Sequence, residues 1–450
     1  MKSFILPICC VWAVSAAQAQ PVSRPVSLVE AMRLSVGNSA QLKKAQLDRQ
    51  ALENRLATGK SAFLPQVNAH FGMDFVPGQP TAFLPATVLD EPTGGYVATT
   101  LGQPWQLAGS VRAEQAIFDE AARRMARAAS ISRGMYDLLA DKAEDDVQAG
   151  TASVFYQTLQ TEKLLGAANA NIAKLEALER AAQLQLDNGY AVPTDVKRVR
   201  VARTNLESQR YNLQVAAQSL RQTLQYLCGI PFEEPISLVD DTTAVPGADS
   251  ARWQSLTLDL ETTTEHRLLQ RQIEFNRVQT RSLRGEIAPK IGAYAALGFM
   301  SQRPDANFFA EGQKWYGLAA VGFRAEVPIF DGFRNRRKTA GMVIERQKIE
   351  EDLRQLGQAK NLEFLQAKGR FQGALQTLRT QTENTALARE IAEKMALQYR
   401  QGAVALTDLL GAQTALAEAE AQYWQQVFNY KLAVLSLLKS VGKVGLWLEG

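Results

Sequence analysis

The stretch Tyr399–Leu410, with the sequence YRQGAVALTDLL, lies between two long proline-free segments and has a counterpart 213 residues earlier, in Leu186–Val196, LDNGYAVPTDV. In both copies a Gly is followed by four residues and then by a Thr-Asp pair. Gly tolerates the left-handed backbone after a helix, and Thr or Asp accepts hydrogen bonds from the free N–H groups of the next helix. Each copy therefore predicts the tip of a helical hairpin. The equivalent positions are Gly189 and Gly402, Thr194 and Thr407, and Asp195 and Asp408.

Other short motifs recur in the same order along the chain, which predicts a duplicated unit. The pairs are Ile117-Phe118-Asp119 with Ile329-Phe330-Asp331, Leu227-Cys228-Gly229 with Ser440-Val441-Gly442, and Phe63-Leu64-Pro65 with Ile287-Ala288-Pro289. We expect a first repeat over residues 20–230, a linker over 231–252, a second repeat over 253–442 and a short tail over 443–450.

The N-terminus has the features of a secretory signal peptide over residues 1–19. Lys2 precedes an apolar run, Phe4–Ala17, and small residues at positions 17 and 19 suit cleavage before Gln20. Cys9 and Cys10 lie inside the apolar run, which argues against lipidation and leaves Cys228 as the single cysteine of the mature chain. An intrachain disulfide is therefore not expected.

The placement of proline predicts long helices, because proline is excluded from helix interiors. In each repeat one long helix matches two shorter helices, so we expect long antiparallel helical hairpins. A capping box, SLVE at Ser27–Glu30, opens the first helix. The expected helices of the first repeat are Ser27–Leu64, Asp119–Asp187 and Thr194–Leu227, and those of the second begin near Trp253, Gly332 and Thr407.

Between the helices, apolar and polar residues alternate with the period of two that is typical of half-exposed strands. The expected strands are Val67–Phe75, Leu107–Ile117, Ile291–Phe299 and Trp315–Val327, and the loops between them are 77–104 and 301–314. Their length and pattern match the wall of a transmembrane β-barrel. Since four strands cannot close a barrel, the chain must combine its strands with those of other copies. The expected fold class is therefore mainly α with a transmembrane β-barrel.

Composition and motifs argue against several function classes. A net charge of +4, with 50 basic and 46 acidic residues interspersed, is too mild to indicate nucleic acid binding. The two histidines, His70 and His266, lack metal-ligand spacing, and Gly59-Lys60-Ser61 lacks the earlier Gly of a phosphate-binding loop. We therefore expect no enzyme, no cofactor and no metal site.

Two basic clusters stand at equivalent places in the two repeats. They are Arg123-Arg124 with Arg127, and Arg334 with Arg336–Lys338. We interpret them as solvated helix starts near a membrane surface, with an anionic ligand site as the alternative.

Taken together, these features resemble the outer-membrane efflux protein family typified by TolC. The resemblance rests on SLVEAMRLSVGNSAQL, FLPQV, VPIFDGF and the tip and helix YRQGAVALTDLLGAQTALAEAEAQY. It implies a homotrimer in the outer membrane with a twelve-strand barrel in lipid and an α-helical barrel across the periplasm. It also implies a passive channel, the exit duct of a tripartite efflux or type I secretion system, closed at its hairpin tips. An inner-membrane pump would supply the energy and a periplasmic adaptor would dock on the tips.

The resemblance also implies site residues. A periplasmic gate would involve Asp408, Tyr399, Thr407 and Asp195, and the adaptor would dock on Gly189, Tyr190, Val192, Thr194, Gly402, Val404 and Leu406. The family's second Asp and its tip Arg are replaced by Gly411 and Ala405. We therefore expect only one ring of carboxylates, from Asp408, and no ionic latch at Ala405. From its own residues, Asp408 could instead serve with Thr407 as a helix cap and nothing more.

Two other classes of protein share part of this pattern. A periplasmic adaptor also presents a helical hairpin, and a structural coiled-coil protein also has long helices. Two hairpins, each preceded by a pair of amphipathic strands, favour the channel over both. The sequence does not indicate the cargo, which could be a drug, a metal ion or a protein.

Overall fold

The computed structural model describes residues 23–86, 95–239 and 249–445. The expected signal peptide, the end of the C-terminal tail and part of the linker lie outside these residues. The chain divides into two compact units. Of the described residues, unit one comprises 23–44, 140–239, 249–264 and 357–445, and unit two comprises 45–86, 95–139 and 265–356.

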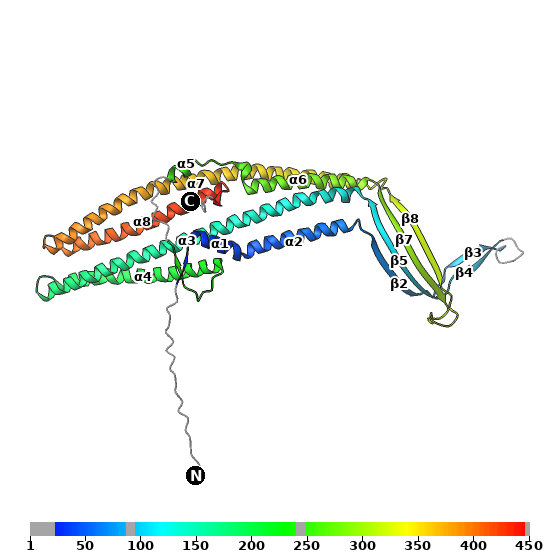
Figure 1. Ribbon diagram of the computed structural model, residues 1–450, viewed down its shortest axis with the longest axis horizontal. Coiled ribbons are helices and arrows are strands. Elements are labelled where there is room, and N and C mark those ends of the chain that lie inside the picture. The colour runs from blue at the N-terminus through cyan, green and yellow to red at the C-terminus, as the bar shows by residue number, and fades with distance from the viewer. Residues whose placement is uncertain (1–22, 87–94, 240–248, 446–450) are drawn as a thin grey trace, which may run out of the picture. The chain divides into compact units, whose positions relative to one another are not determined.

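Long helices make up most of the chain (Figure 1), as the proline pattern predicts. Two of them, α3 (Glu120–Asp187) and α7 (Arg334–Arg400), run through both units. In unit one, α3 turns back into α4 (Pro193–Cys228) and α7 turns back into α8 (Leu406–Ser440), which gives two helical hairpins. The hairpin prediction is confirmed.

Two of the expected helices are interrupted. The expected helix Ser27–Leu64 is split into α1 (Leu28–Asn38) and α2 (Ala40–Ser61), because Ser39 adopts an extended backbone and its hydroxyl accepts the Leu42 N–H at 3.3 Å. The expected helix from Trp253 is split into α5 (Asp249–Gln254), a 3-10 turn at Leu260–Thr262 and α6 (Thr264–Arg284). The side chain of Asp259 caps that turn by accepting the Glu261 N–H.

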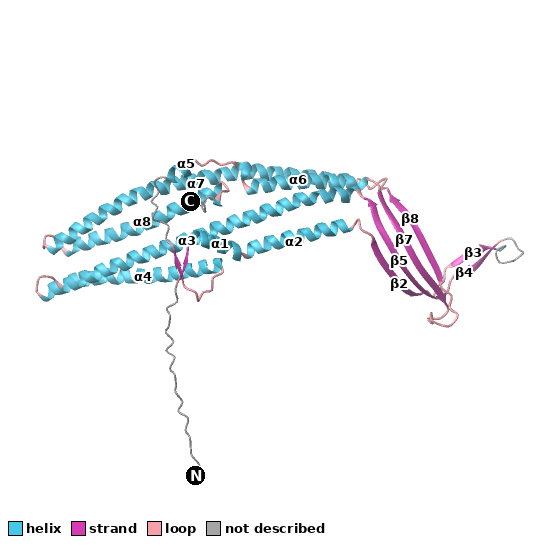
Figure 2. Ribbon diagram, in the orientation of Figure 1, coloured by secondary structure: helices cyan, strands magenta, loops and turns pink. Residues whose placement is uncertain are grey.

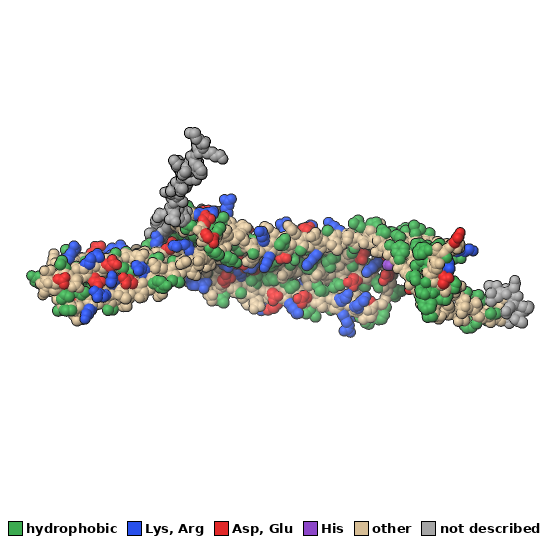
Figure 3. All heavy atoms as spheres, turned by 90° about the horizontal axis from the view of Figure 1, so that it is seen from below, with side chains coloured by type: hydrophobic (Ala, Val, Ile, Leu, Met, Phe, Trp, Pro, Cys, Tyr) green, Lys and Arg blue, Asp and Glu red, His purple; other side chains and the backbone are tan. Residues whose placement is uncertain are grey.

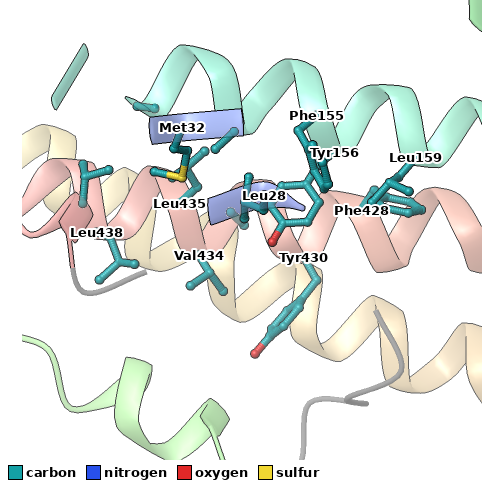
Figure 4. Packing of buried hydrophobic residues seen from close by; sticks show 14 of the residues in the cluster. Leu28, Met32, Phe155, Tyr156, Leu159, Phe428, Tyr430, Val434, Leu435 and Leu438 are labelled. Carbon is teal, nitrogen blue, oxygen red and sulfur yellow. The ribbon is translucent and has the colours of Figure 1, made fainter. Parts of the chain in front are cut away.

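Unit one has a hydrophobic core where α1, α3, α7 and α8 meet (Figure 4). A short parallel pair, β1 (Arg24–Val26) with β6 (Ile236–Leu238), lies beside it and was not expected from the sequence. The aromatic rings of Tyr156 on α3 and Phe428 on α8 lie 6.3 Å apart, and both side chains are fully buried. Burial of such rings dominates core energetics, so the two hairpins are joined through this core.

Unit two contains a four-stranded antiparallel sheet in the order β2-β5-β7-β8 (Figure 2). The strands are β2 (Gln66–Phe75), β5 (Trp105–Phe118), β7 (Lys290–Arg303) and β8 (Tyr316–Glu326). All four expected strands are therefore confirmed. The sheet is open, with β2 and β8 at its edges.

The sheet is amphipathic. One face carries exposed large apolar side chains, among them Phe71, Leu297 and Val321, which is 86% exposed. The other face carries mainly polar and small residues such as His70, Arg112 and Gly298, together with the larger Met300 and Leu318. Hydrophobic side chains gather over the strands in Figure 3. Such a wide exposed apolar surface indicates contact with a membrane or a partner.

The segment 77–104, expected as a loop, forms a second hairpin from β3 (Thr81–Pro85) and β4 (Tyr96–Thr100). Its residues 87–94 lie outside the described part of the chain.

Among residues 23–86, 95–239 and 249–445, none of the helices combines the length and the apolar character needed to cross a membrane.

Candidate functional site

The two hairpin tips have the same backbone turn. Gly189 (φ 80°) and Gly402 (φ 70°) both adopt the left-handed conformation. After α3, the N–H of Tyr190 donates to the Gln185 carbonyl at 2.8 Å, and after α7 the N–H of Ala403 donates to the Gln398 carbonyl at 2.9 Å. This pattern is a Schellman motif, which satisfies the last free carbonyls of a helix. The sequence-based prediction of left-handed glycines at the tips is confirmed.

The same turn ends the returning helices. Gly229 (φ 69°) follows α4 and Gly442 (φ 67°) follows α8. The N–H groups of Ile230 and Lys443 donate to carbonyls five residues earlier, at 2.9 and 3.0 Å. The spacing between Gly229 and Gly442 equals that between the tip glycines, as a duplicated chain would produce.

The helix caps expected from the Thr-Asp pairs do not form. The N-cap residues are Val192 for α4 and Ala405 for α8, and neither helix start has a side-chain cap hydrogen bond. Pro193 at the first helical position explains the earlier start of α4, since proline suits that position. The cap interpretation of Asp408 with Thr407 is therefore wrong.

The tip residues differ in exposure. Tyr190 is 87% exposed and Val192 is 54% exposed, and Gly189, Thr194 and Gly402 are also exposed. Val404 is half-buried, whereas Leu406 is only 5% exposed. The Leu406 side chain thus packs inside unit one, and the other six residues form the accessible surface of the tips.

Tyr399 and Asp195 come together beside the tips, although they belong to different hairpins. The Tyr399 hydroxyl on α7 donates to the Gln185 Oε1 on α3 at 2.8 Å. Burial raises the pKa of Tyr399, and the negative charge of Asp195 at the start of α4 raises it further. The Asp195 Oδ1 also lies 3.7 Å from the Arg198 Nη1. Tyr399 therefore keeps its proton and joins α7 to α3.

Asp408 lies apart from this cluster. It occupies the first turn of α8, where the helix dipole favours a negative charge. Its side chain and that of Thr407 are exposed. Within the described part of the chain, the Asp408 carboxylate has no hydrogen-bond or ion-pair partner. Its charge is therefore available to ions in solution.

Gln185 was missed by the sequence reasoning. It is one turn before Gly189 and is half-buried in unit one. Glutamine is common on helix surfaces, and no local pattern distinguishes this one as a partner of Tyr399. Only the contact between two hairpins identifies it.

A comparison with known families connects this geometry to a protein class. Residues 269–443 match the family described as outer membrane efflux protein. The chain is similar to the outer membrane efflux proteins. The matched residues include β7, β8, α7 and α8, and so one tip with Tyr399 and Asp408. The family resemblance expected from the sequence is confirmed. No curated protein matches the chain.

Several solved structures share the fold. The CmeC outer membrane channel of Campylobacter jejuni is 13% identical, with a TM-score of 0.72, over 93% of this chain and 86% of that one. The outer-membrane channel OprN is 16% identical, with a TM-score of 0.70, over 98% of both chains. The MtrE outer membrane channel of Neisseria gonorrhoeae, in its open state, is 14% identical, with a TM-score of 0.69, over 93% and 89%.

These likenesses establish the fold over nearly the whole chain. Together with the match to the outer membrane efflux proteins, they support an efflux channel.

Proposed function

We propose that the protein is the exit duct of a tripartite efflux or type I secretion system, a homotrimeric channel in the outer membrane with a large periplasmic part. The observation that carries this proposal is the open, amphipathic four-stranded sheet joined to two matched hairpins. Its apolar face would contact outer-membrane lipid, and its polar face would line the pore.

The unpaired edge strands of the sheet support the proposed trimer. Within the described residues, β2 pairs only with β5 and β8 pairs only with β7, so each edge strand has one row of unpaired N–H and C=O groups. Each unsatisfied group costs several kcal/mol in lipid. Because neighbouring strands alternate in direction, β8 of one copy can pair antiparallel with β2 of the next. Three copies would then close the twelve-strand barrel that the family resemblance implies.

The tip geometry supports a gate. In our proposal, the hydrogen bond from Tyr399 to Gln185 holds the two hairpins of one copy together in the closed state, with Asp195 beside it. The exposed Asp408 side chains of three copies would form a ring of carboxylates. Like charges held at short range attract cations. Since position 411 is Gly, this ring would be single.

The exposed tip residues support a docking surface. A periplasmic adaptor would contact Tyr190, Val192 and Thr194 at one tip, and Gly402 and Val404 at the other. Leu406 would contribute indirectly, by packing inside the hairpin. An inner-membrane pump would supply the energy, and the duct itself would be passive.

Two measurements on one preparation test this proposal. We expect the full chain to fractionate with the outer membrane as a heat-modifiable oligomer, and the detergent-purified oligomer to conduct ions across a planar bilayer. A soluble periplasmic monomer would contradict the proposal and favour an adaptor. A membrane-bound oligomer without conductance would contradict the channel.

A further inference from the structure

Unit two carries a basic and aromatic surface where the strands meet the helices. We define the junction surface as residues 117–127, 281–289 and 327–338, which connect β5 to α3, α6 to β7 and β8 to α7 (Figures 1 and 2). It contains nine Arg or Lys residues against four Asp or Glu. Its excess of five positive charges is larger than the net charge of +4 of the whole chain.

Hydrogen bonds hold this surface together. The Arg124 Nη1 donates to the Arg281 carbonyl at 2.9 Å, and the Ser282 hydroxyl donates to the Ala121 carbonyl at 2.7 Å. The Asn335 side-chain amide donates to the carbonyl of Leu283. The start of α3, the end of α6 and the start of α7 thus form one fixed platform.

Most of the basic side chains on the platform lack an acidic partner. Glu120 pairs with Arg123 and Arg124, and Glu286 pairs with Lys338 at 3.5 Å. The other two acids, Asp119 and Asp331, accept backbone N–H groups at the starts of α3 and α7. In the described ranges, six exposed arginines of the junction surface have no ion-pair partner: Arg127, Arg281, Arg284, Arg334, Arg336 and Arg337.

Exposed apolar side chains lie on the same platform. Ile329 is 96% exposed and Phe330 is 75% exposed. Phe333 is 57% exposed and has φ 64°, the one positive φ of a non-glycine residue in the described part of the chain. That backbone conformation is costly for a bulky residue. It brings the rings of Phe330 and Phe333 edge to face, with centroids 5.5 Å apart.

Exposed aromatic rings are unfavourable in water, and so is the strained backbone that holds them, whereas the unpaired arginines are well solvated there. Exposed aromatic rings held by a strained backbone, next to unpaired arginines, match the boundary of a bilayer leaflet, where hydrocarbon gives way to anionic headgroups. Basic residues at such a boundary attract anionic lipids, and an isolated phosphate ion would not require the aromatic pair. We propose that the junction surface binds anionic phospholipid, with Phe330 and Phe333 in the acyl region and Arg334, Arg336 and Arg337 on the headgroups.

This inference rests on the proposed outer-membrane channel, and lipid titration tests it separately. The delipidated full-length oligomer would be titrated with phosphatidylglycerol or with phosphatidylethanolamine of the same chain length, and bound lipid counted by native mass spectrometry. We expect binding of phosphatidylglycerol to be about tenfold tighter. Equal affinity for the two lipids in the wild-type protein would overturn the inference.

Matched variants locate the site. Replacing Arg334, Arg336 and Arg337 together by Gln should remove the preference for phosphatidylglycerol. The control replaces Lys43, Lys44 and Arg379 by Gln, which removes the same charge from exposed residues elsewhere on α2 and α7. If the control variant lost the preference for phosphatidylglycerol equally, a local site would be contradicted, because the preference would then depend only on the net charge of the protein.

The aromatic pair is tested by Phe330→Ser combined with Phe333→Gly, which also relieves the strained backbone. We expect weaker binding of both lipids by an intact oligomer. Dissociation of the oligomer would instead mean that a neighbouring copy covers these rings, and would overturn the lipid assignment. Conductance of each sample separates the two proposals: a conducting channel without lipid preference defeats this inference alone, and a preparation without conductance defeats the proposed channel.

Discussion

Replacing Tyr399 by Phe should open the channel, because it removes the hydrogen bond that joins α7 to α3 beside the tips. The bond is 2.8 Å long and its acceptor is the Oε1 of Gln185. Phe keeps the ring and its packing, so the substitution removes one interaction and little else. Both side chains are half-buried, so water can reach Gln185 once the hydroxyl is gone.

The expected effect follows from the strength of one neutral hydrogen bond. Such a bond contributes about 0.5–1.5 kcal/mol net, and partial exposure places this one near the lower end. At about 0.7 kcal/mol per copy, three copies that open together would lose about 2 kcal/mol of closed-state stability. The ratio of open to closed channels should then rise about thirtyfold.

Single-channel recording in planar bilayers measures that ratio directly. Tyr211→Phe is the matched control, because Tyr211 is 67% exposed on α4, and it should leave the open probability unchanged. Gln185→Ala should open the channel as Tyr399→Phe does, and the double variant should open it no further.

The pH dependence provides a second check. Because the pKa of Tyr399 lies above its ordinary value of 10.0, the hydroxyl remains a donor at lower pH. Its stabilising effect is fully present below pH 10 and is lost only as the pH rises through the raised pKa. The difference in open probability between the wild type and Tyr399→Phe should therefore be constant from pH 6 to 9. This account of the gate would be refuted if Tyr399→Phe had the same open probability as the wild type. It would also be refuted if the effects of the two single variants added in full in the double variant.

Three further changes test the tips and the helix ends. Asp408→Asn removes the charge and should leave the trimer stable, because the wild-type side chain does not cap its helix. It should weaken cation selectivity and block by multivalent cations; unchanged block would exclude a carboxylate gate. Gly402→Pro should abolish export but not trimer assembly, because proline cannot adopt φ 70°; normal export would remove the docking proposal. Gly229→Ala should destabilise the protein by about 1 kcal/mol more than Gly442→Ala in thermal unfolding, because a Cβ at Gly229 would lie 2.5 Å from the Asn38 side chain, whereas at Gly442 the nearest atom is 3.9 Å away. Equal losses would contradict the contact with Asn38.

Much of the fold could be predicted because its signals are local. Proline exclusion located α3 and α7, and the change of period from 3.6 to 2 located all four strands of the sheet. The break between α1 and α2 was missed, although Ser39 is a good N-cap residue for α2. No proline lies between Ser27 and Leu64, so the rule that located the other long helices gave no sign of the break.

The missed features depend on contacts between distant residues. The β1–β6 pair joins strands of three residues each from far apart in the chain, too short to have a period. The Tyr399–Gln185 bond joins residues 214 positions apart. The Thr-Asp pairs suggested caps by their composition, but Pro193 and Leu406 begin their helices earlier. Sequence patterns located the tips, but not which side chains pair beside them.

The central claim is that three copies close one barrel through β8 and β2, and disulfide crosslinking between these strands tests it most directly. One cysteine would replace Ala69 on β2, and a second would replace, in turn, each residue from Gly317 to Ala325 on β8. Cys228 should not interfere, because it is buried and burial raises its pKa to about 11. We predict at least one register in which oxidised protein runs in denaturing gels at three times the mass of the chain and returns to monomer on reduction. A discrete dimer or tetramer, or monomer alone in every register, would contradict the claim.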